Sequence, residues 1–301
     1  MRNRIKLIAE GALLLNALIW GGTFVIVKSA LTDSSPMMFV AVRFTISTLI
    51  LLPFAYKSLS GLSKRSVMDG FNLGVLLLVG FVLQTIGLKY TTAIKSAFIT
   101  GTFVVFTPIF QTIIEKKFPS LANIAGILFV IVGIIFLSSG EDSVFEIFFE
   151  IGASFNFGDF LTLLCAVFYA LYIVYLDIIS RRNEFKYLAF SQIAVTAVLG
   201  FAAAFTFSAF ELEGIQFQLT DNLILALAYT SILATVITLL LQTRYQKEVT
   251  PTRAGLIFSM EPIFAAVFAY IVLTEVLSYL GIIGCIFIFT GVLISELLTK
   301  D

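Results

Sequence analysis

The chain has 301 residues, of which 59% are hydrophobic and 13% are charged, and it contains no histidine. Soluble domains are roughly 45–50% apolar and about 25% charged, so this chain has too little polar surface for a water-soluble globule. Its 19 basic residues balance its 19 acidic ones, which excludes the positive field of a nucleic-acid-binding protein. The composition predicts an integral membrane protein.

The chain contains few side chains that could bind a metal or a cofactor. The two cysteines, Cys165 and Cys285, lie inside apolar stretches and have neither disulfide-framework nor metal-ligand spacing. Without histidine, the chain lacks the commonest zinc ligand and neutral-pH acid or base. No phosphate-binding Walker loop is found. We therefore expect no metal, no cofactor and no catalytic residues.

Apolar stretches long enough to cross a bilayer recur along the whole chain. A membrane helix needs about 20 mainly apolar residues, because the hydrocarbon core is roughly 30 Å thick. In chain order we expect spans at residues 8–28, 36–56, 68–88, 94–114, 120–139, 158–178, 187–209, 221–242, 252–273 and 278–298. The first stretch is too long for a signal peptide and lacks a small-residue cleavage site. The predicted fold class is all-α integral membrane, with ten transmembrane helices.

The basic residues indicate the orientation of these spans. If the N-terminus is cytoplasmic, most Lys and Arg residues fall in cytoplasmic segments, and only Lys28, Lys89 and Lys95 fall outside. Ten spans return the chain to the side on which it began. We expect a multi-pass protein of the cell (inner) membrane with both termini in the cytoplasm.

One long break, around residues 140–157, divides the spans into two groups of five. We expect a first five-helix repeat at 1–139, an interfacial linker at 140–157, and a second repeat at 158–301. The halves match in order: residues 16–20 with 165–169, 89–90 with 244–245, 108–110 with 262–264, and Gly126 and Gly133 with Gly284 and Gly291. A unit with an odd number of spans ends on the side opposite to its start, so its copy is inverted. Inverted repeats around a central cavity are typical of secondary transporters.

Two prolines lie mid-membrane in matching spans, Pro108 in the fourth and Pro262 in the ninth. Each leaves a carbonyl one turn back, at Val104 and Phe258, without its helical partner and kinks its helix. The kinks have two interpretations: a bend that belongs to a substrate site, or bends that packing tolerates.

Several motifs resemble the EamA family of the drug/metabolite transporter superfamily. They are Trp20-Gly21-Gly22-Thr23-Phe24, residues 87–93 through 98–101, residues 156–159 leading into 166–172, and Glu261-Pro262 followed by Glu275. The resemblance covers nearly the whole chain. It implies two five-helix repeats, cytoplasmic termini, a cavity built by spans 1, 3, 4, 6, 8 and 9, and export of amino acids and related metabolites. It also implies that spans 5 and 10 serve packing or homodimer contacts. Glu115 falls about two positions from the place that Glu275 would predict, so no shared role is carried over to it.

Two charged residues inside spans are candidates for the site. Arg43 is costly in a bilayer unless it faces a water-filled cavity or a partner. It either holds a substrate carboxylate or clamps helices through an ion pair or carbonyl groups. Glu261 either couples transport to protons or is a paired structural acid, with Arg43 as one partner.

The remaining candidates are aromatic and polar side chains on the proposed cavity spans. Rings offer apolar contact and cation–π attraction, although packing between helices is the alternative for each of them. The aromatic candidates are Trp20, Tyr90, Phe98, Phe106, Tyr169, Tyr172 and Phe258. Polar groups bind either a solute or a neighbouring helix. The polar candidates are Asn16, Thr23, Gln84, Thr100, Thr102, Gln192 and Gln242.

The sequence thus favours a secondary transporter that exports small organic metabolites such as amino acids by alternating access. Its expected partners are a small-molecule solute, the lipid bilayer and a second copy of the chain, with no nucleic acid. An intramembrane enzyme would need a cluster of acids, cysteines or metal ligands, and the sequence shows none. A non-transporting membrane receptor or assembly protein is the other alternative, for which the loops are short.

Overall fold

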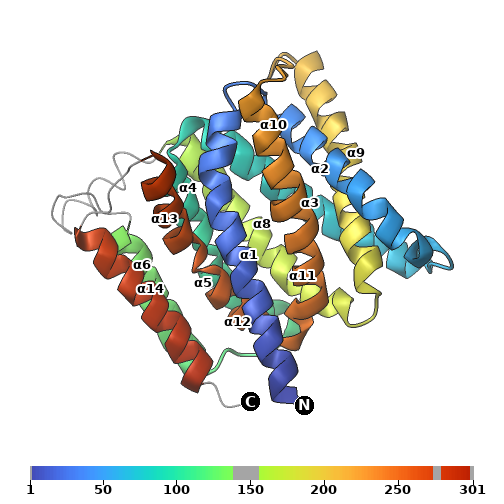
Figure 1. The fold of residues 1–301 in the computed structure, drawn as a ribbon. Helices are drawn as coiled ribbons and strands as arrows, with labels where there is room; N and C mark the ends of the chain where they lie inside the picture. Colours follow the sequence, from blue (N-terminus) through green and yellow to red (C-terminus); the bar gives the residue numbers. More distant parts are fainter. Residues whose placement is uncertain (1, 138–155, 274–278, 299–301) are drawn as a thin grey trace.

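The computed structural model describes residues 2–137, 156–273 and 279–298 (Figure 1). Most of the linker expected at 140–157, and Glu275, lie outside these ranges. Within them the regular structure is helical, apart from an isolated bridge between Ser34 and Phe217.

Within the described ranges, the first half contains six α-helices and one 3₁₀ turn. In chain order they are α1 (Arg2–Ala30), α2 (Pro36–Ala55), η1 (Tyr56–Leu59), α3 (Lys64–Tyr90), α4 (Ala93–Gly101), α5 (Phe103–Glu115) and α6 (Leu121–Leu137). The second half contains α8 (Phe157–Ser180), α9 (Phe185–Ala209), α10 (Asp221–Ala228), the π-helix η2 (Tyr229–Ile237), α11 (Thr238–Tyr245), the 3₁₀ turn η3 (Gln246–Glu248), α12 (Pro251–Phe258), α13 (Glu261–Leu273) and α14 (Tyr279–Leu298).

Eight helical segments of the described ranges are long and apolar enough to cross a membrane. They correspond to the expected spans 1–4 and 6–9. The expected spans 120–139 and 278–298 appear as shorter apolar segments, Leu121–Gly133 and Tyr279–Ile294. The protein is therefore an all-helical, multi-pass membrane protein.

The fourth and ninth spans, which carry the two mid-membrane prolines, are both interrupted. The fourth breaks at Thr102, between α4 and α5, and Pro108 lies inside α5. The ninth breaks after α12, and Pro262 is the second residue of α13. A proline in the first turn of a helix loses no hydrogen bond, so Pro262 starts a new helix and does not bend an existing one. The break in the ninth span thus falls between Phe258 and Pro262, where the sequence predicted a kink, whereas the break in the fourth span precedes both Val104 and Pro108.

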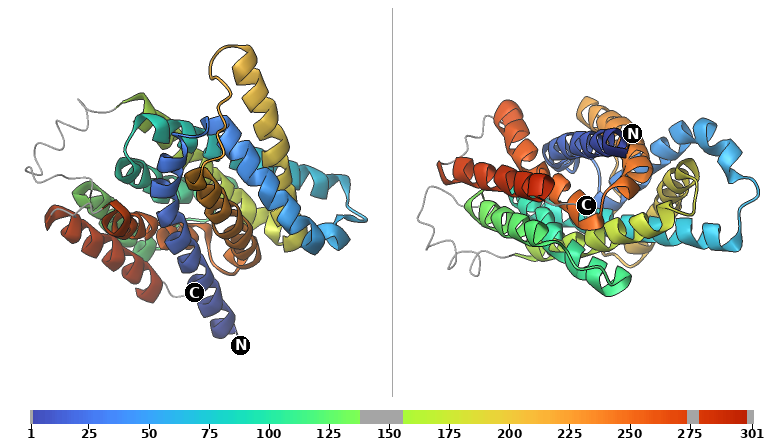
Figure 2. Two further views of the ribbon diagram at one scale, coloured as in Figure 1. Left: turned by 45° about the horizontal axis from the view of Figure 1, so that its top comes forward. Right: turned by 90° about the horizontal axis from the view of Figure 1, so that it is seen from below.

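Helices of one half pack mainly on helices of the other (Figures 1 and 2). α2 packs on α9, and α6 packs on α14. α1, the first span, packs on η2 and α11 of the eighth span. In the same way α8, the sixth span, packs on α3, the third span. The pairing is thus unchanged when the two halves exchange roles.

The small-residue faces of α6 and α14 pack against each other within this chain. A Cβ atom added to Gly133 would lie 2.7 Å from the Gly284 carbonyl oxygen, and one added to Gly291 would lie 2.6 Å from that of Gly126. Glycine is therefore required for this close approach of the two backbones. The glycines that the sequence assigned to packing or dimer contacts join these two helices.

A polar contact between loops holds the end of the bundle where α1 finishes. The backbone N–H of Ser35 donates to the Gln216 carbonyl at 2.9 Å. The Asp33 carboxylate accepts hydrogen bonds from the Asn222 amide at 3.0 Å and the Thr220 hydroxyl at 2.7 Å. These bonds, led by that from Asn222, hold the pKa of Asp33 below its ordinary value.

Candidate functional site

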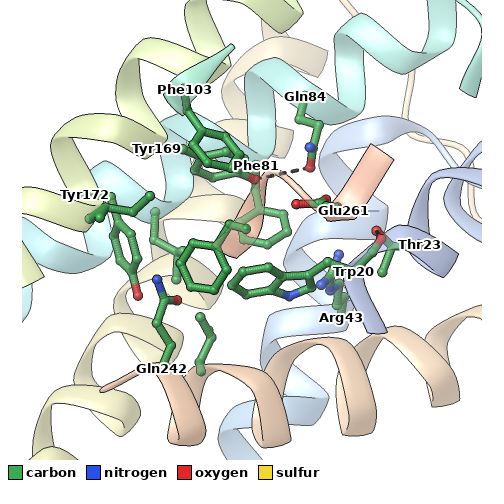
Figure 3. Close-up of a pocket in the computed structure, with 14 residues that line it drawn as sticks. Trp20, Thr23, Arg43, Phe81, Gln84, Phe103, Tyr169, Tyr172, Gln242 and Glu261 are labelled. Carbon is green, nitrogen blue, oxygen red and sulfur yellow. Dashed lines mark hydrogen bonds between the residues drawn. The ribbon is translucent and has the colours of Figure 1, made fainter. Parts of the chain in front are cut away.

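A narrow cavity lies between the two halves, with a volume of about 50 Å³. Such a volume holds only a few water molecules. Figure 3 shows the side chains that surround it, which come from α1, α2, α3, α5, α8, α11, α12 and α13. They are Trp20, Thr23, Arg43, Leu77, Phe81, Gln84, Phe103, Tyr169, Tyr172, Ile173, Leu239, Gln242, Phe258 and Glu261.

Arg43 enters the cavity wall from α2 and is 97% buried, since its relative exposure is 3%. Its Nε donates to the Thr235 hydroxyl at 2.8 Å, and its Nη2 donates to the Ala234 carbonyl at 3.1 Å. The guanidinium carbon lies 4.6 Å from the centre of the Phe81 ring, within the range of a cation–π contact. The carbonyl clamp that the sequence allowed is therefore present. No other hydrogen bond of this guanidinium occurs in the described ranges, so further N–H groups remain for a ligand.

The π-helix η2 explains how one carbonyl serves two helices. The Ala234 carbonyl also accepts a hydrogen bond from the indole of Trp20 at 3.1 Å, while the same indole N–H lies 3.1 Å from the Thr238 hydroxyl. A π-helical turn shifts hydrogen bonding from the fourth to the fifth residue and frees backbone groups for other partners. Here it supports Arg43 on one side and Trp20 on the other.

Glu261 begins α13 and is buried, with 7% exposure. Neither a hydrogen bond nor an ion pair to its carboxylate is found among the described residues, so the predicted pairing with Arg43 is not formed. A buried carboxylate without a partner is costly, which makes a bound cation or proton favourable at this position.

Trp20 and Tyr169 occupy matching positions in α1 and α8. The Tyr169 hydroxyl donates to the Gln84 side-chain oxygen at 3.1 Å, and its ring lies 5.8 Å from that of Phe81. The Trp20 ring lies 5.3 Å from that of Phe258. The walls of the cavity are therefore aromatic on both sides, and their polar edges are already hydrogen-bonded.

The structure brings nine of the residues predicted for the site together around this cavity. They are Trp20, Thr23, Arg43, Gln84, Tyr169, Tyr172, Gln242, Phe258 and Glu261. Asn16 is fully buried outside the wall, where its amide donates to the Thr238 carbonyl at 2.9 Å. Phe98, Thr102 and Phe106 also lie outside the wall, and Tyr90 is half exposed beside Phe157. The aliphatic lining and Phe81 and Phe103 carried no chemical signal that would separate them from ordinary packing residues.

An ion pair joins the halves at the end of the bundle where α1 finishes. The Lys95 ammonium of α4 lies 2.6 Å from the Asp159 carboxylate of α8. Asp159 is fully buried and also accepts hydrogen bonds from the Thr91 hydroxyl at 2.6 Å and the Asn156 backbone at 2.9 Å. The Lys28 ammonium of α1 binds the carbonyl groups of Leu88 and Thr91 nearby.

A second ion pair joins the halves at the other end, where α1 begins. The Arg253 guanidinium of α12 lies 2.8 Å from the Glu10 carboxylate of α1. The step from Glu10 to Lys28 along α1 corresponds to about 27 Å, so the two ion pairs lie far apart with the cavity between them.

The two ion pairs use matching positions of the repeats. Asp159 follows Glu10 by the same step that relates Tyr169 to Trp20. Lys95 and Arg253 each occupy the third position after a threonine N-cap, Thr92 or Thr250, whose side chain accepts from their backbone N–H. In both pairs the cation and the acid belong to different halves.

Comparisons with known proteins agree with this architecture. A model of the EamA-like transporter family matches residues 7–139 and again 156–297. An uncharacterized transporter of Archaeoglobus fulgidus is 35% identical over 97% of this chain and 87% of its own length. The uncharacterized transporter YyaM of Bacillus subtilis is 24% identical over 92% of this chain and 89% of its own.

One solved crystal structure of a protein covers all of both chains with a TM-score of 0.75 at 18% sequence identity, a likeness of fold. The family model accounts for both halves of the sequence, and its family comprises transporters, which excludes an enzyme. The chain belongs to the EamA-like transporter family, with two EamA domains.

Proposed function

We propose that the protein is a secondary transporter that exports small organic metabolites, with zwitterionic amino acids as the first candidates. The observation that carries this proposal is the cavity itself, where a buried cation and a buried, unpartnered carboxylate stand among aromatic rings. The spare N–H groups of Arg43 suit a solute carboxylate, and Glu261 suits an ammonium group. The rings of Trp20 and Tyr169 suit an apolar side chain.

Alternating access is the mechanism that this arrangement supports best. The cavity is too small for an amino acid in its present form, so the helices that line it must separate when a solute enters. In this mechanism the two repeats act as an inverted pair, and the ion pairs Lys95–Asp159 and Arg253–Glu10 close opposite ends of the cavity. Opening one end breaks one pair while the other remains.

The charge pattern supports an orientation with the end of α1 that carries Glu10 in the cytoplasm of the cell. Both termini are then cytoplasmic, and the Lys95–Asp159 pair faces outward. The energy for export comes from the solute gradient or from a coupled ion. A non-transporting receptor, the alternative that the sequence left open, gains no support from a family model that describes transporters.

Release of solute from proteoliposomes tests the proposal. Vesicles that contain the reconstituted protein are loaded with one labelled amino acid at a time. The rate at which the amino acid is released is compared with the rate from protein-free vesicles. Arg43→Gln is expected to abolish release of amino acids but to leave that of matched amines less affected, because the amines lack the carboxylate. Glu261→Gln is expected to spare the matched carboxylic acids. The proposal fails if no amino acid of the panel is released faster than from empty vesicles.

A further inference from the structure

The side-chain oxygen of Gln242 in the cavity wall has no hydrogen-bond donor among the described residues. Gln242 of α11 is 1% exposed, and no donor reaches its side-chain oxygen, Oε1, within the described part of the chain. Gln242 lines the cavity, and Figure 3 shows its amide directed into it. A buried acceptor without a donor is unfavourable, so this atom requires water or a ligand when the protein is folded.

The orientation of this amide is fixed by a chain of hydrogen bonds. Gln242 Nε2 donates to Gln246 Oε1 at 2.8 Å, and Gln246 Nε2 donates to the Ile173 carbonyl of α8 at 2.7 Å. The Ile173 carbonyl only accepts, so Gln246 must present its nitrogen there and its oxygen to Gln242. Gln242 must then turn its own nitrogen to Gln246 and its oxygen to the cavity.

The neighbouring polar groups cannot supply the missing donor. The Tyr172 hydroxyl donates to Gln192 Oε1 at 2.7 Å, and Gln192 Nε2 donates to the Thr243 hydroxyl. The indole N–H of Trp20 is directed to Ala234 and Thr238. A solute or a water molecule is the remaining source.

The position of Gln242 sets which part of a solute it meets. Arg43 is held at Ala234 and Thr235, and Gln242 follows Ala234 by two turns of helix, about 12 Å along the axis. A group bound by Gln242 is therefore distant from a group bound by Arg43. We propose that Gln242 determines specificity by accepting a hydrogen bond from an O–H or N–H group at the distal end of the solute.

This inference rests on the proposed function, because it takes Arg43 as the site of the solute carboxylate. It goes further by requiring a distal donor. A site built to hydrogen-bond a solute discriminates strongly against an analogue that lacks the group, since the buried acceptor is then left unpaired. Tyrosine and phenylalanine differ by one such donor and are otherwise nearly matched.

Trp20 provides a direct test of binding, since it is the only tryptophan of the chain and lies in the cavity wall. Purified protein is titrated with tyrosine and with phenylalanine while tryptophan fluorescence is excited at the red edge of its band, where the added solutes do not absorb. Wild-type protein is expected to bind tyrosine about 10-fold more tightly than phenylalanine, a difference of about 1.4 kcal/mol. Gln242→Met is expected to abolish the preference, because the tyrosine hydroxyl loses its acceptor and phenylalanine no longer leaves a buried acceptor unpaired.

Two further variants separate this role from a structural one. Gln84→Leu is the matched control from the opposite wall, because the oxygen of Gln84 already accepts from Tyr169, and it is expected to keep the preference whatever it does to affinity. Gln246→Met leaves Gln242 in place but removes the acceptor that orients it, so it is expected to reduce the preference. If Gln242→Met fails to fold, the preference for tyrosine measured in Gln246→Met tests the role of Gln242 instead.

Equal affinity of the wild type for both solutes overturns the inference, as does a preference that survives in Gln242→Met. If neither solute alters the fluorescence, the amino-acid class fails and this inference fails with it. A preference that depends on Gln242 without flux in vesicles leaves Gln242 as a recognition residue and refutes transport of these solutes.

Discussion

Replacing Lys95 by methionine removes the cation that closes one end of the cavity. Asp159 is fully buried, whereas the Lys95 side chain is 34% exposed. Loss of one partner costs about 3–5 kcal/mol in a buried pair and up to about 1 kcal/mol in an exposed one. Because Lys95 is partly exposed and Asp159 keeps its other hydrogen bonds, we expect the loss of Lys95 to destabilise the closed form of this end by about 1–2 kcal/mol. That changes the ratio of closed to open states at this end by about 10-fold.

Arg253→Met makes the corresponding change at the other end and is expected to have the larger effect. The side chains of Arg253 and Glu10 are 7% and 15% exposed, so solvent screens this pair less. We expect the loss of Arg253 to destabilise the closed form of this end by about 2–3 kcal/mol, which favours opening where α1 begins by about 30- to 150-fold. The double variant is expected to show a smaller bias than Arg253→Met alone, because the two single effects have opposite signs.

Access to a cysteine in the cavity measures this bias. Thr23 lines the cavity, so Thr23→Cys is the reporter, in a background where Cys165 and Cys285 are replaced by alanine. A membrane-impermeant maleimide is added to intact cells and to inside-out vesicles. Lys95→Met is expected to speed labelling from outside, and Arg253→Met is expected to speed it from the cytoplasmic side.

A purely structural role for the ion pairs makes a different prediction. Both variants would then lower the melting temperature, labelling would rise from both sides, and the double variant would be the most reactive of the three. Labelling of Lys95→Met from the cytoplasmic side only, or a double variant more biased than either single one, would refute the assignment of one pair to each end.

The remaining predictions concern stability, measured as melting temperature in detergent. Gly133→Ala is expected to destabilise the protein by about 1–3 kcal/mol, since its Cβ would meet the backbone of Gly284. The control Gly11→Ala places its Cβ within 4 Å of no other atom and should not destabilise. Equal melting temperatures of the two variants would contradict the α6–α14 contact. The lowered pKa of Asp33 means that its stabilisation is present above the unfolded pKa, near 3.8, and is lost as the pH falls through the folded pKa. Asp33→Asn should therefore melt below wild type at neutral pH, with a difference that closes in acid; a difference independent of pH would exclude this role for the carboxylate.

The composition and the internal matches were sufficient to predict a helical membrane protein built from two repeats, because hydrophobic length is a local property of the sequence. The family model confirms both EamA domains. The break in the fourth span was not predicted, because a proline marks where a backbone donor is absent but not where the helix ends. α4 ends at Gly101, well before Pro108, and this glycine is a helix-ending signal that the prolines overshadowed.

The site was predictable only in part, since side-chain partners depend on tertiary contacts. Arg43 was recognisable as a buried charge, but its clamp on Ala234 depends on a π-helix that has no clear sequence signal. Tyr90 stood in a family motif, yet it lies at the exposed end of α3. Gln242 appeared as one of several polar residues, and its importance emerges from the fixed orientation of its amide.

The matching of the two ion pairs has a thermodynamic consequence for a transporter. Each pair joins a cation of one half to an acid of the other, so duplication of one half supplies similar closing interactions at both ends. Two states of similar free energy interconvert readily, and a solute needs little binding energy to shift the balance between them. The pairs differ in burial, however, and Arg253–Glu10 is the better shielded. The resting protein should therefore keep its cytoplasmic end closed more firmly than its outer end, so that Thr23→Cys in the otherwise wild-type protein reacts faster from outside.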